Sequence, residues 1–288
     1  MKPVTIGIPQ PKELLPFTGE RYTSALWGQL HHEHFHRYLF ILEFCRGADV
    51  LDMACGEGYG ASLLGHFAKT VEGVDIDQPT IDHALRSYKT ETVSFRLGNA
   101  TCIPVADHSK DVVVSFETLE HLRDHEAFLA EVKRVLKVDG LLAISTPEID
   151  AYNEAGGKQN PFHLRELTQK QFQHLLKSQF AHVQLYSQRP LCGSCIAPVE
   201  RAPVKELRFY DRVAPDAYNA IESFPTPIYF IALASNRELP EIRYSLLHDK
   251  FHAYDLAQKQ NPAGRPSQAR AGLFKLLLSG LSALTRKE

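Results

Sequence analysis

Short runs of β-branched and apolar residues alternate with stretches that favour helix from residue 49 onward. Four of these runs predict buried parallel strands, at residues 49–54, 70–75, 111–116 and 140–146. Helices are predicted between them, at residues 61–69, 79–88 and 123–136. Because successive parallel strands need a crossover connection, this alternation indicates βαβ units. It therefore predicts an α/β protein with a doubly wound, mostly parallel sheet.

The segment between the last two predicted strands differs from the rest of the chain. Residues 182–188 and 228–234 continue the strand pattern, whereas residues 189–227 carry six prolines and show no clear periodicity. An insertion of this size is usually functional, because ligand sites in such sheets collect loops at one end. We expect a lid-like or specificity loop here, with a tolerated surface excursion as the alternative.

The charge of the chain limits its partners. Its 32 Lys plus Arg stand against 34 Asp plus Glu, a formal net charge of −2. Residues 265–288 hold five basic residues and one acid, so the remainder is more acidic than the total suggests. This excludes the strongly basic body expected of a protein that binds nucleic acid.

Two further features bear on where the protein works. The N-terminal residues MKPVTIGIPQPKELLPF lack the apolar core of a signal peptide, and the five cysteines are an odd number. No apolar run approaches the roughly 20 residues that span a bilayer. We therefore expect reduced thiols and a cytoplasmic protein.

The strongest motif is VLDMACGEGYGA, in which a hydrophobic strand runs directly into a glycine loop and then a helix. Gly56, Gly58 and Gly60 allow a tight turn and let a ligand approach the backbone. Nineteen residues after Gly56, the second strand ends in Asp75, whose carboxylate can accept hydrogen bonds from two ribose hydroxyls. Asp52 lies just before the loop, where it suits a ligand that presents a cation and not a pyrophosphate.

These motifs resemble those of the class I S-adenosylmethionine-dependent methyltransferases. DMACGEGYG is similar to the glycine-rich first motif of that family, and VEGVDID is similar to its second. The resemblance covers residues 49–146 and implies S-adenosylmethionine as cofactor on a seven-stranded, Rossmann-like sheet. We expect an N-terminal helical cover at residues 1–48, a methyltransferase domain at 49–235 and a C-terminal helical extension at 236–288.

The resemblance also assigns residues to the cofactor. Asp52 and the glycine loop would hold the methionine end, Asp75 would bind the ribose, and Ile76 would pack against adenine. The predicted cofactor contacts are Tyr22, Asp52, Ala54, Gly56, Gly58, Asp75, Ile76, Asn99, Ala100 and Phe116.

The segment LGNATCIPVADHSKD resembles the third stretch of the family, in which an acid and the next residue read the adenine edge. Here Asn99 takes the place of the acid, and Ala100 follows it. The side-chain oxygen of Asn99 can still accept a hydrogen bond from the exocyclic amine of adenine.

A cluster of acids and a histidine follows the strand at residues 111–116. Glu117, Glu120 and His121 in ETLEHL stand at i, i+3 and i+4, on one face if the segment is helical. Ligands bind at the carboxyl ends of strands in such sheets, so this face would point toward the acceptor. His163 in NPFHLREL follows the next strand and can approach from the neighbouring loop.

The cluster offers two ways to remove the proton of a hydroxyl acceptor. In one, His121 or His163 is a general base, with Glu120 beside it. In the other, Glu117, Glu120, His121 and His163 ligate Mg or Mn, which binds the acceptor oxygen. This set resembles the ExxEH metal site of small-RNA 3′-terminal 2′-O-methyltransferases and of ubiquinone-pathway O-methyltransferases. A purely structural role is the third interpretation.

The segment before the first strand, residues 19–38, concentrates four histidines within six residues, together with aromatic residues. As a helical cover over the cofactor, it can offer Arg21 or Tyr22 to the methionine carboxylate. It can offer His34 or Arg37 to the acceptor. The alternative is an amphipathic helix that packs on the sheet and leaves its histidines in solvent.

The C-terminal part predicts a linker followed by an amphipathic helix. Residues 261–267, NPAGRPS, have the composition of a linker, and residues 268–288 place leucines on one helical face and basic residues on the flank. This pattern suits a helix that lies on a membrane surface, and it equally suits a docking or dimerisation helix.

The whole pattern resembles bacterial methyltransferases of sugar and cell-surface polysaccharide metabolism, through GERY, EHFHRY, CGEGYG, ETLEHL and NPFHLREL. That resemblance implies O-methylation of a sugar or glycan by a cytoplasmic enzyme whose tail touches the inner membrane surface. A methyltransferase of a quinone precursor or another small metabolite is the nearest alternative. A non-catalytic binding protein with a methyltransferase-like fold is a further one. RNA is not expected as acceptor, because the body of the chain offers no basic track.

Overall fold

The computed structural model describes residues 21–23, 29–149, 160–191, 209–214, 217–221, 227–240 and 245–247, together with Pro11, Glu13 and Leu15. The chain divides into two compact units, Met1–Ser245 and Leu246–Glu288, and the fold below is that of the first. The predicted linker at residues 261–267 and the amphipathic tail at 268–288 lie outside the described residues. Of the described helices, none has the length and apolar character needed to cross a membrane.

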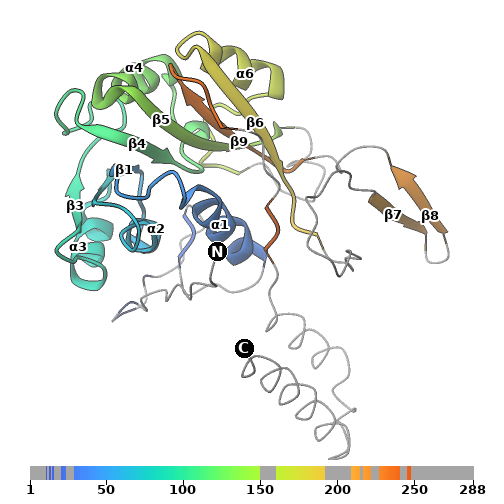
Figure 1. Ribbon diagram of the computed structural model, residues 1–288. Helices are drawn as coiled ribbons and strands as arrows, with labels where there is room; N and C mark the ends of the chain where they lie inside the picture. Colours follow the sequence, from blue (N-terminus) through green and yellow to red (C-terminus); the bar gives the residue numbers. More distant parts are fainter. Residues whose placement is uncertain are drawn as a thin grey trace, which may run out of the picture. The chain divides into compact units, whose positions relative to one another are not determined.

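Seven strands form one mixed sheet in the order β3-β2-β1-β4-β5-β9-β6 (Figure 1). They are β1 (Asp49–Met53), β2 (Thr70–Asp75), β3 (Val93–Leu97), β4 (Lys110–Ser115), β5 (Leu136–Pro147), β6 (His182–Gln188) and β9 (Tyr229–Ser235). β1 to β5 pair in parallel, whereas β9 runs antiparallel to both β5 and β6. The predicted doubly wound, mostly parallel sheet is confirmed, with one reversed strand.

Helices cover both faces of this sheet (Figure 1). One face carries α1 (Gln29–Ile41), α2 (Tyr59–Leu64) and α3 (Gln78–Ser87), and the other carries α4 (His125–Val135) and α6 (Gln169–Lys177). Because successive strand residues point to opposite faces, Val50 and Ala143 pack with the first set, whereas Leu51 and Leu142 pack with the second. Burial on both faces explains why the central strands are unbroken apolar runs.

The ends of the helices follow from local sequence. Asp77 caps α3 by accepting a hydrogen bond from the Thr80 N–H at 3.1 Å, and a proline stands in the first turn as predicted. The predicted helix at residues 61–69 is wrong at its end, since α2 stops at Leu64. Gly65 follows, a poor helix former, and a Cβ there would lie 2.4 Å from Val93 Cγ2. Close packing on β3 therefore ends the helix early.

Neither the strand β3 nor the helix α6 is among the elements predicted from the sequence. The short edge strand β3 has only Val93 and Phe95 buried, so it offers no apolar run. The helix α6 is polar apart from Phe172, Leu175 and Leu176, which are its buried residues. β3 thus gives little periodicity, whereas the three apolar residues of α6 stand at the i, i+3 and i+4 spacing of a helix and give a signal that the prediction missed.

The predicted insertion at residues 189–227 lies between β6 and β9, and part of it is regular. β7 (Phe209–Ala214) and β8 (Ala217–Ile221) pair as an antiparallel hairpin, a two-stranded sheet of its own. The sequence pattern predicts no strands there. The role of the insertion as a lid stays a prediction.

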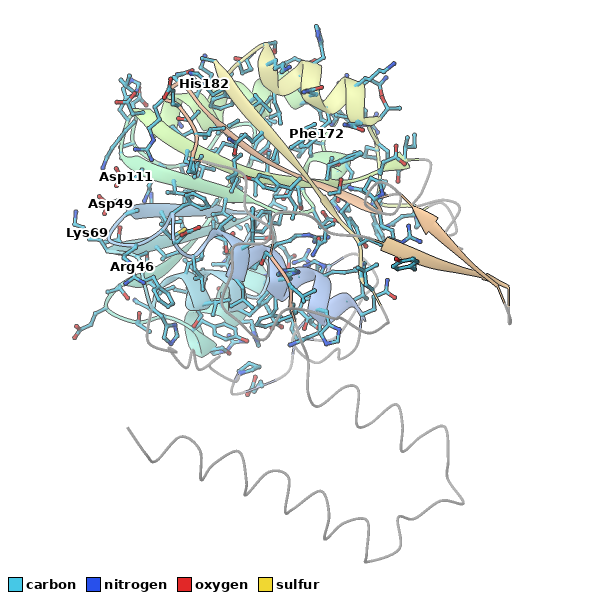
Figure 2. All side chains as sticks on the ribbon, turned by 45° about the vertical axis from the view of Figure 1, so that its right-hand side comes forward. Arg46, Asp49, Lys69, Asp111, Phe172 and His182 are labelled. Carbon is cyan, nitrogen blue, oxygen red and sulfur yellow. The ribbon has the colours of Figure 1, made fainter. Side chains whose placement is uncertain are left out.

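Paired charges gather where the strands begin, at the amino edge of the sheet. The Asp49 carboxylate accepts from the Thr70 hydroxyl at 2.8 Å and from Lys69 Nζ at 3.2 Å. Lys137 Nζ donates to Asp111 Oδ1 at 2.8 Å, and the Asp49 N–H donates to Asp111 Oδ2 at 2.9 Å. Figure 2 shows Asp49, Lys69 and Asp111 together at one side of the sheet. These partly exposed ion pairs lie at the edge where the parallel strands begin.

Candidate active site

The opposite, carboxyl edge of the sheet gathers the residues that the sequence motifs connect with function. β1 leads into the glycine loop, β2 ends at Asp75, and β4 ends just before Phe116 and Glu117. The strand order places these three ends side by side. Open α/β sheets bind ligands outside the carboxyl ends of the strands, where the strand order reverses, and here that point lies between β1 and β4.

The glycines of the loop serve different purposes. Gly56 has φ +55°, and a Cβ there would meet nothing within 4 Å, so its open side leaves room for a ligand. A Cβ at Gly58 would lie 2.8 Å from the Phe95 ring, and one at Gly60 would lie 2.1 Å from the Tyr38 ring. Gly58 and Gly60 therefore allow α2 to pack closely, and Gly56 is the glycine of the three with open space beside it.

Asp52 is buried at the end of β1. Its carboxylate accepts a hydrogen bond from the Tyr38 hydroxyl, 3.1 Å from Oδ1. Burial raises the pKa of Asp52 to about 7; the Tyr38 hydrogen bond opposes this, and the nearby Asp75 carboxylate adds to it. A cation beside Asp52 would restore its charge at neutral pH. The predicted contact of Asp52 with the ammonium group of a methionine moiety is compatible with this environment and stays a prediction.

Asp75 closes β2 and is held by backbone donors. The N–H groups of Gly56 and Asp77 each donate to its carboxylate at 3.0 Å. Arg21 Nη1 lies 3.2 Å from Asp77 Oδ2 and 3.9 Å from Asp75 Oδ1. Arg21, a predicted partner of the methionine carboxylate, therefore lies beside the predicted ribose acid instead.

The two predicted adenine contacts differ in the structure. Ile76 is 67% exposed next to Asp75, an apolar side chain available for stacking on a base. Asn99 is engaged locally, because its Oδ1 accepts from the N–H of Thr101 at 2.9 Å and from the Thr101 hydroxyl at 3.0 Å. A hydrogen bond from the adenine amine would compete with both donors. Ala100, the next residue, is buried.

An aromatic layer from the N-terminal segment covers the glycine loop. Tyr22 stacks on His34 with 4.7 Å between ring centroids and meets Tyr59 edge-on at 5.2 Å. His34 Nδ1 lies 3.1 Å from the Tyr59 hydroxyl, and burial lowers the pKa of His34 well below its usual value. Tyr38 meets Phe116 edge-on at 5.1 Å. Tyr22, His34 and Phe116 thus lie among the aromatic side chains near the glycine loop, and their predicted contacts with cofactor or acceptor stay predictions.

Glu117 does not share a helical face with Glu120 and His121. Only Leu119–His121 form a short 3-10 turn, η1, and Glu117 precedes it with φ +52°. Glu117 Oε1 accepts from Ser145 Oγ at 2.6 Å, and Ser145 Oγ accepts from the Glu117 N–H at 3.0 Å. The predicted helical arrangement is wrong here, because the turn after β4 directs this carboxylate to β5. Glu117 stays outside the group that the other predicted metal ligands form.

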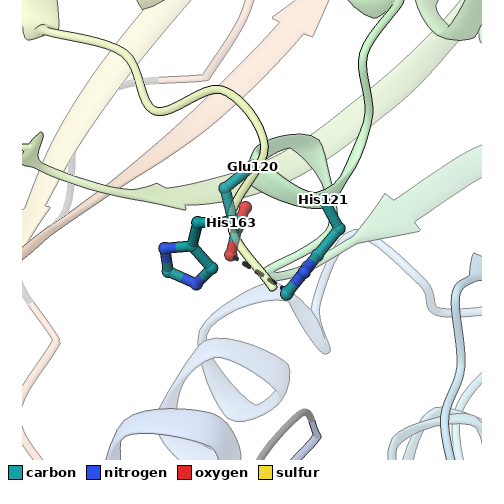
Figure 3. A group of neighbouring side chains, drawn as sticks. All are labelled: Glu120, His121 and His163. Carbon is teal, nitrogen blue, oxygen red and sulfur yellow. Dashed lines mark ion pairs between the residues drawn. The ribbon is translucent and has the colours of Figure 1, made fainter. Parts of the chain in front are cut away.

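Glu120, His121 and His163 come together at this edge (Figure 3). One ligand atom from each residue lies within 4.8 Å of the other two. Glu120 is buried, the two imidazoles are partly exposed, and Figure 3 shows the carboxylate directed toward the His121 ring. The Leu164 N–H donates to the Glu120 carbonyl at 2.7 Å, which ties the loop of His163 to η1. One carboxylate with two imidazoles suits either general base catalysis or a divalent metal.

Hydrogen bonds fix which nitrogen of each imidazole acts. His121 Nδ1 lies 3.0 Å from the Phe162 carbonyl oxygen, which can only accept, so Nε2 is the acceptor nitrogen. His163 Nδ1 lies 2.5 Å from Glu166 Oε1, and His163 Nε2 lies 3.0 Å from Asn160 Nδ2, so Nε2 is again the acceptor. A carbonyl or carboxylate at Nδ1 is how proteins orient both catalytic and metal-binding imidazoles.

The charge of Glu120 depends on what binds beside it. Burial raises the pKa of Glu120 well above its usual value, and repulsion from Glu117 adds to this. A metal ion or an imidazolium next to the carboxylate would favour the ionised form. The group therefore combines a buried carboxyl whose pKa is raised with two imidazoles that are oriented by hydrogen bonds.

Arg37, a predicted acceptor-side residue, is fully buried in α1. Its Nη1 lies 3.5 Å from Glu117 Oε1, and its Nε donates to Gln188 Oε1 at 2.7 Å. The guanidinium carbon lies 4.4 Å above the Tyr229 ring centre. Because Glu117, Gln188 and Tyr229 all stand at the carboxyl edge, Arg37 lies at the same edge as Glu120.

Three residues of the site have no role in the sequence prediction: Glu166, Asn160 and Ser145. Glu166 has a detectable signal, since NPFHLREL sets a carboxylate three residues after His163. Ser145 lies within a buried strand and offers none. Asn160 lies in a loop whose conformation local sequence does not determine.

Comparisons with known proteins bear on this site. Residues 51–144, from β1 into β5, match the family model of a methyltransferase domain. A protein of Mycolicibacterium smegmatis named as an S-adenosylmethionine-dependent methyltransferase is 38% identical over 170 residues, 57% of this chain and 64% of that protein. The phthiotriol/phenolphthiotriol dimycocerosates methyltransferase of Mycobacterium tuberculosis is 34% identical over 131 residues, 43% of this chain and 47% of that protein. The chain thus spans less than two thirds of either relative's length.

A solved structure shares the fold. It is the complex between the Trm112 methyltransferase activator of Haloferax volcanii and a methyltransferase, matched with a TM-score of 0.55 and 18% sequence identity. The match covers 74% of this chain and 93% of the other. The matched family region contains the glycine loop, Asp75, Glu120 and His121, whereas His163 follows it in the chain.

Proposed function

We propose that this chain, whose residues 51–144 form a class I S-adenosylmethionine-dependent methyltransferase domain, transfers the methyl group of that cofactor to a hydroxyl oxygen. The choice of a hydroxyl rests on the convergence of Glu120, His121 and His163 within 4.8 Å. A sulfonium methyl needs little activation, but a hydroxyl has to lose its proton to react. A buried acid with two oriented imidazoles provides for that step.

The residues at the glycine loop suit the cofactor. The open side of Gly56 leaves room for its methionine end, and the Asp52 carboxylate would pair with the ammonium group. Asp75 would exchange its bonds to backbone N–H groups for ribose hydroxyls, and the exposed Ile76 would cover adenine. The aromatic layer that includes Tyr22 would exclude water from the reacting atoms.

His163 is the residue that we propose as general base when no metal takes part. Glu166 holds its Nδ1–H at 2.5 Å and would stabilise the imidazolium, so Nε2 can accept the proton. The acceptor oxygen bonds to the methyl carbon as the carbon–sulfur bond breaks, and the hydroxyl proton passes to Nε2. Asn160, which donates to Nε2 at 3.0 Å, gives up that bond when the hydroxyl arrives.

A divalent metal at the same residues is the second route. Glu120, His121 and His163 would hold it through a carboxylate oxygen and two Nε2 atoms, and the two imidazoles favour Mn over Mg. Such an ion would lower the pKa of a bound hydroxyl. Glu117 would not be a ligand, because its carboxylate is held by Ser145.

A sugar hydroxyl, on a glycan or a cell-surface polysaccharide, is the acceptor that we propose. Phe162 is 40% exposed next to His163 and offers an apolar surface beside polar groups, the mixture that orients a polyol ring. A smaller or more apolar alcohol is the alternative. The relative named for phthiotriol and phenolphthiotriol dimycocerosates supports that alternative.

Cytoplasmic action at the inner membrane surface is also part of the proposal. It rests on the basic, leucine-rich pattern of residues 268–288, which suits an interfacial helix. Sedimentation of the full chain with anionic and neutral vesicles tests it. We expect binding to the anionic vesicles alone, and no binding to either contradicts the proposal.

Transfer of a labelled methyl group from S-adenosylmethionine to a panel of sugars and small alcohols tests the reaction. We expect a labelled ether with at least one acceptor. Cofactor binding by calorimetry without label in any product contradicts O-methylation. EDTA separates the two routes, since a loss that Mn or Mg restores supports the metal and unchanged activity supports His163 as base.

His163→Ala and His182→Ala form a matched pair for this assay. His182 begins β6 at the amino edge of the sheet (Figure 2), so its replacement removes an imidazole from the opposite side. We expect kcat to fall about 10²- to 10⁴-fold for His163→Ala, the usual contribution of a general base, and to stay unchanged for His182→Ala. Equal losses in both variants would show that the effect comes from the fold.

A further inference from the structure

The buried guanidinium of Arg37 has donors without acceptors. Its side chain has no exposed surface, and its Nε donates to Gln188 Oε1 at 2.7 Å. Nη1 and Nη2 make no hydrogen bond in the part of the chain that the structure describes. Buried donors that lose their hydrogen bonds to water without gaining an acceptor destabilise a fold. Binding of a ligand by these donors is therefore the first explanation to test.

The neighbouring acids balance the charge of Arg37 but leave these donors unmet. Glu117 Oε1 lies 3.5 Å from Nη1 and takes the Ser145 hydroxyl at 2.6 Å instead. Glu33 Oε2 accepts from the Tyr229 hydroxyl at 3.0 Å. The guanidinium carbon lies 4.4 Å from the Tyr229 ring centre, so the ring contacts the guanidinium and accepts no hydrogen bond from Nη1 or Nη2.

The guanidinium of Arg37 lies on the acceptor side of the sheet. Arg37 contacts the end of β6 through Gln188, the start of β9 through Tyr229, and the residue that follows β4 through Glu117. The predicted cofactor residues follow β1 and β2, on the other side of β4. Arg37 is close enough to Glu120 for its charge to lower the pKa of that carboxyl, against the larger effect of burial, so a group bound to Arg37 would lie near Glu120.

We propose that Arg37 binds a carboxylate of the acceptor through paired hydrogen bonds from Nη1 and Nη2. The planar guanidinium matches a carboxylate in a two-pronged geometry that lysine cannot reproduce. The inference rests on the proposed function and narrows its acceptor to a hydroxy acid, such as a uronic acid in a glycan. The carboxylate fixes the substrate, and the hydroxyl a few bonds away reaches Glu120, His121 and His163.

Binding of matched acids and amides tests this proposal. The protein is saturated with S-adenosylhomocysteine and titrated by calorimetry with glucuronic, glyceric and 4-hydroxybenzoic acids and with their neutral amides. We expect at least one acid to bind tenfold or more tightly than its amide. Arg37→Lys keeps the positive charge but loses the two-pronged guanidinium. It should therefore reduce the ratio of acid affinity to amide affinity to about threefold or less.

Arg46→Lys is the matched control. Arg46 also stacks on an aromatic ring, 5.1 Å from the Phe67 centroid, but it is exposed and lies outside the carboxyl edge (Figure 2). We expect the ratio to be unchanged in this variant. Thermal melting of both variants identifies any loss of fold, and in that case the ratio of the unmodified protein still decides the question.

Three outcomes would overturn the proposal. No acid binds more tightly than its amide to the unmodified protein, or the ratio survives Arg37→Lys. Alternatively, Arg37→Lys weakens S-adenosylhomocysteine binding tenfold and spares the acids, so that Arg37 serves the carboxylate of the cofactor. Failure of the proposed function gives a different result, which is an intact acid preference without methyl transfer to any hydroxyl.

Discussion

Carboxyl groups at the two edges of the sheet differ in burial and in the direction of their pKa shifts. At the amino edge the pKa of Asp49 is lowered by the Thr70 hydrogen bond, and two lysines lie within 4 Å of its carboxylate, Lys69 and Lys137. At the carboxyl edge burial raises the pKa of Asp52 and of Glu120. The Asp49 carboxylate at the amino edge is ion-paired and partly exposed to solvent, whereas the Asp52 and Glu120 carboxyls at the carboxyl edge are buried.

This difference separates charges that serve the fold from charges that serve a ligand. A partly exposed ion pair keeps most of its hydration, so it neither costs nor contributes much. A buried carboxyl whose pKa is raised weakens the fold when it ionises. Such groups are common at functional sites, where a bound ligand can supply the opposite charge. We therefore expect ligands to bind at the carboxyl edge.

Replacing Asp75 should have the largest effect on the cofactor. Asp75→Ala removes the acceptor of two ribose hydroxyls, each a charged hydrogen bond of about 1.5–3 kcal/mol, so we expect at least about 100-fold weaker binding. Calorimetric titration with S-adenosylmethionine measures it, and thermal melting checks the fold. Asp111→Ala, an acid at the amino edge, is the control and should bind normally. Unchanged affinity in Asp75→Ala would show that the ribose lies elsewhere.

Asp52 makes the ligand-free protein less stable as pH rises. The folded state holds the proton of Asp52 up to pH about 7, whereas the unfolded state releases it near 3.8. Between these values the folded state binds more protons, so the free energy of unfolding falls with rising pH. Asp52→Asn removes this loss and should stabilise the protein at pH 8 by about 2–4 kcal/mol. Urea unfolding at pH 5 and pH 8 measures the difference, and destabilisation at pH 8 would contradict it.

The same carboxyl should make cofactor binding depend on pH. The ammonium group pairs with ionised Asp52, so below its pKa of about 7 the affinity should fall about tenfold per pH unit. Calorimetry from pH 5.5 to pH 8.5 measures the dependence. Asp52→Asn should bind weakly and show little of it. A pH profile equally steep in both proteins would assign the titration to another group.

The sequence predicts the positions of the glycine loop and of Asp75 better than it predicts the turn that follows β4. The glycine loop and Asp75 are each fixed by a strand that enters them directly, so local pattern and spacing suffice. Glu117 departs from its predicted face because a turn with φ +52° follows β4, and nothing in ETLEHL indicates that conformation. Glu166 has a local signal, but its bond to His163 depends on the loop.

The unmet donors of Arg37 show a second limit of sequence patterns. In EHFHRY this arginine could equally face solvent, and only the packing of α1 on β6 and β9 buries it. The burial of Nη1 and Nη2 without a hydrogen bond among the described residues is a property of the folded molecule and not of a motif. The same holds for Asn99, whose side chain turns to Thr101. Tertiary contacts decide these residues, and local propensity does not.

Asp49→Asn at the amino edge should have the smallest effect. Its carboxylate is partly exposed and shares its charge with Lys69 at 3.2 Å, so the loss of stability should be about 1 kcal/mol or less. Because the pKa of Asp49 is lowered in the folded state, its contribution is present above its ordinary pKa of 3.8 and disappears as the pH falls through the folded pKa. Urea unfolding at pH 7 and pH 3 measures this, and added salt should reduce the effect at pH 7. A loss of several kcal/mol in the free energy of unfolding, or weaker cofactor binding, would mean that the amino edge also contributes to ligand binding. The two edges would then not have separate roles.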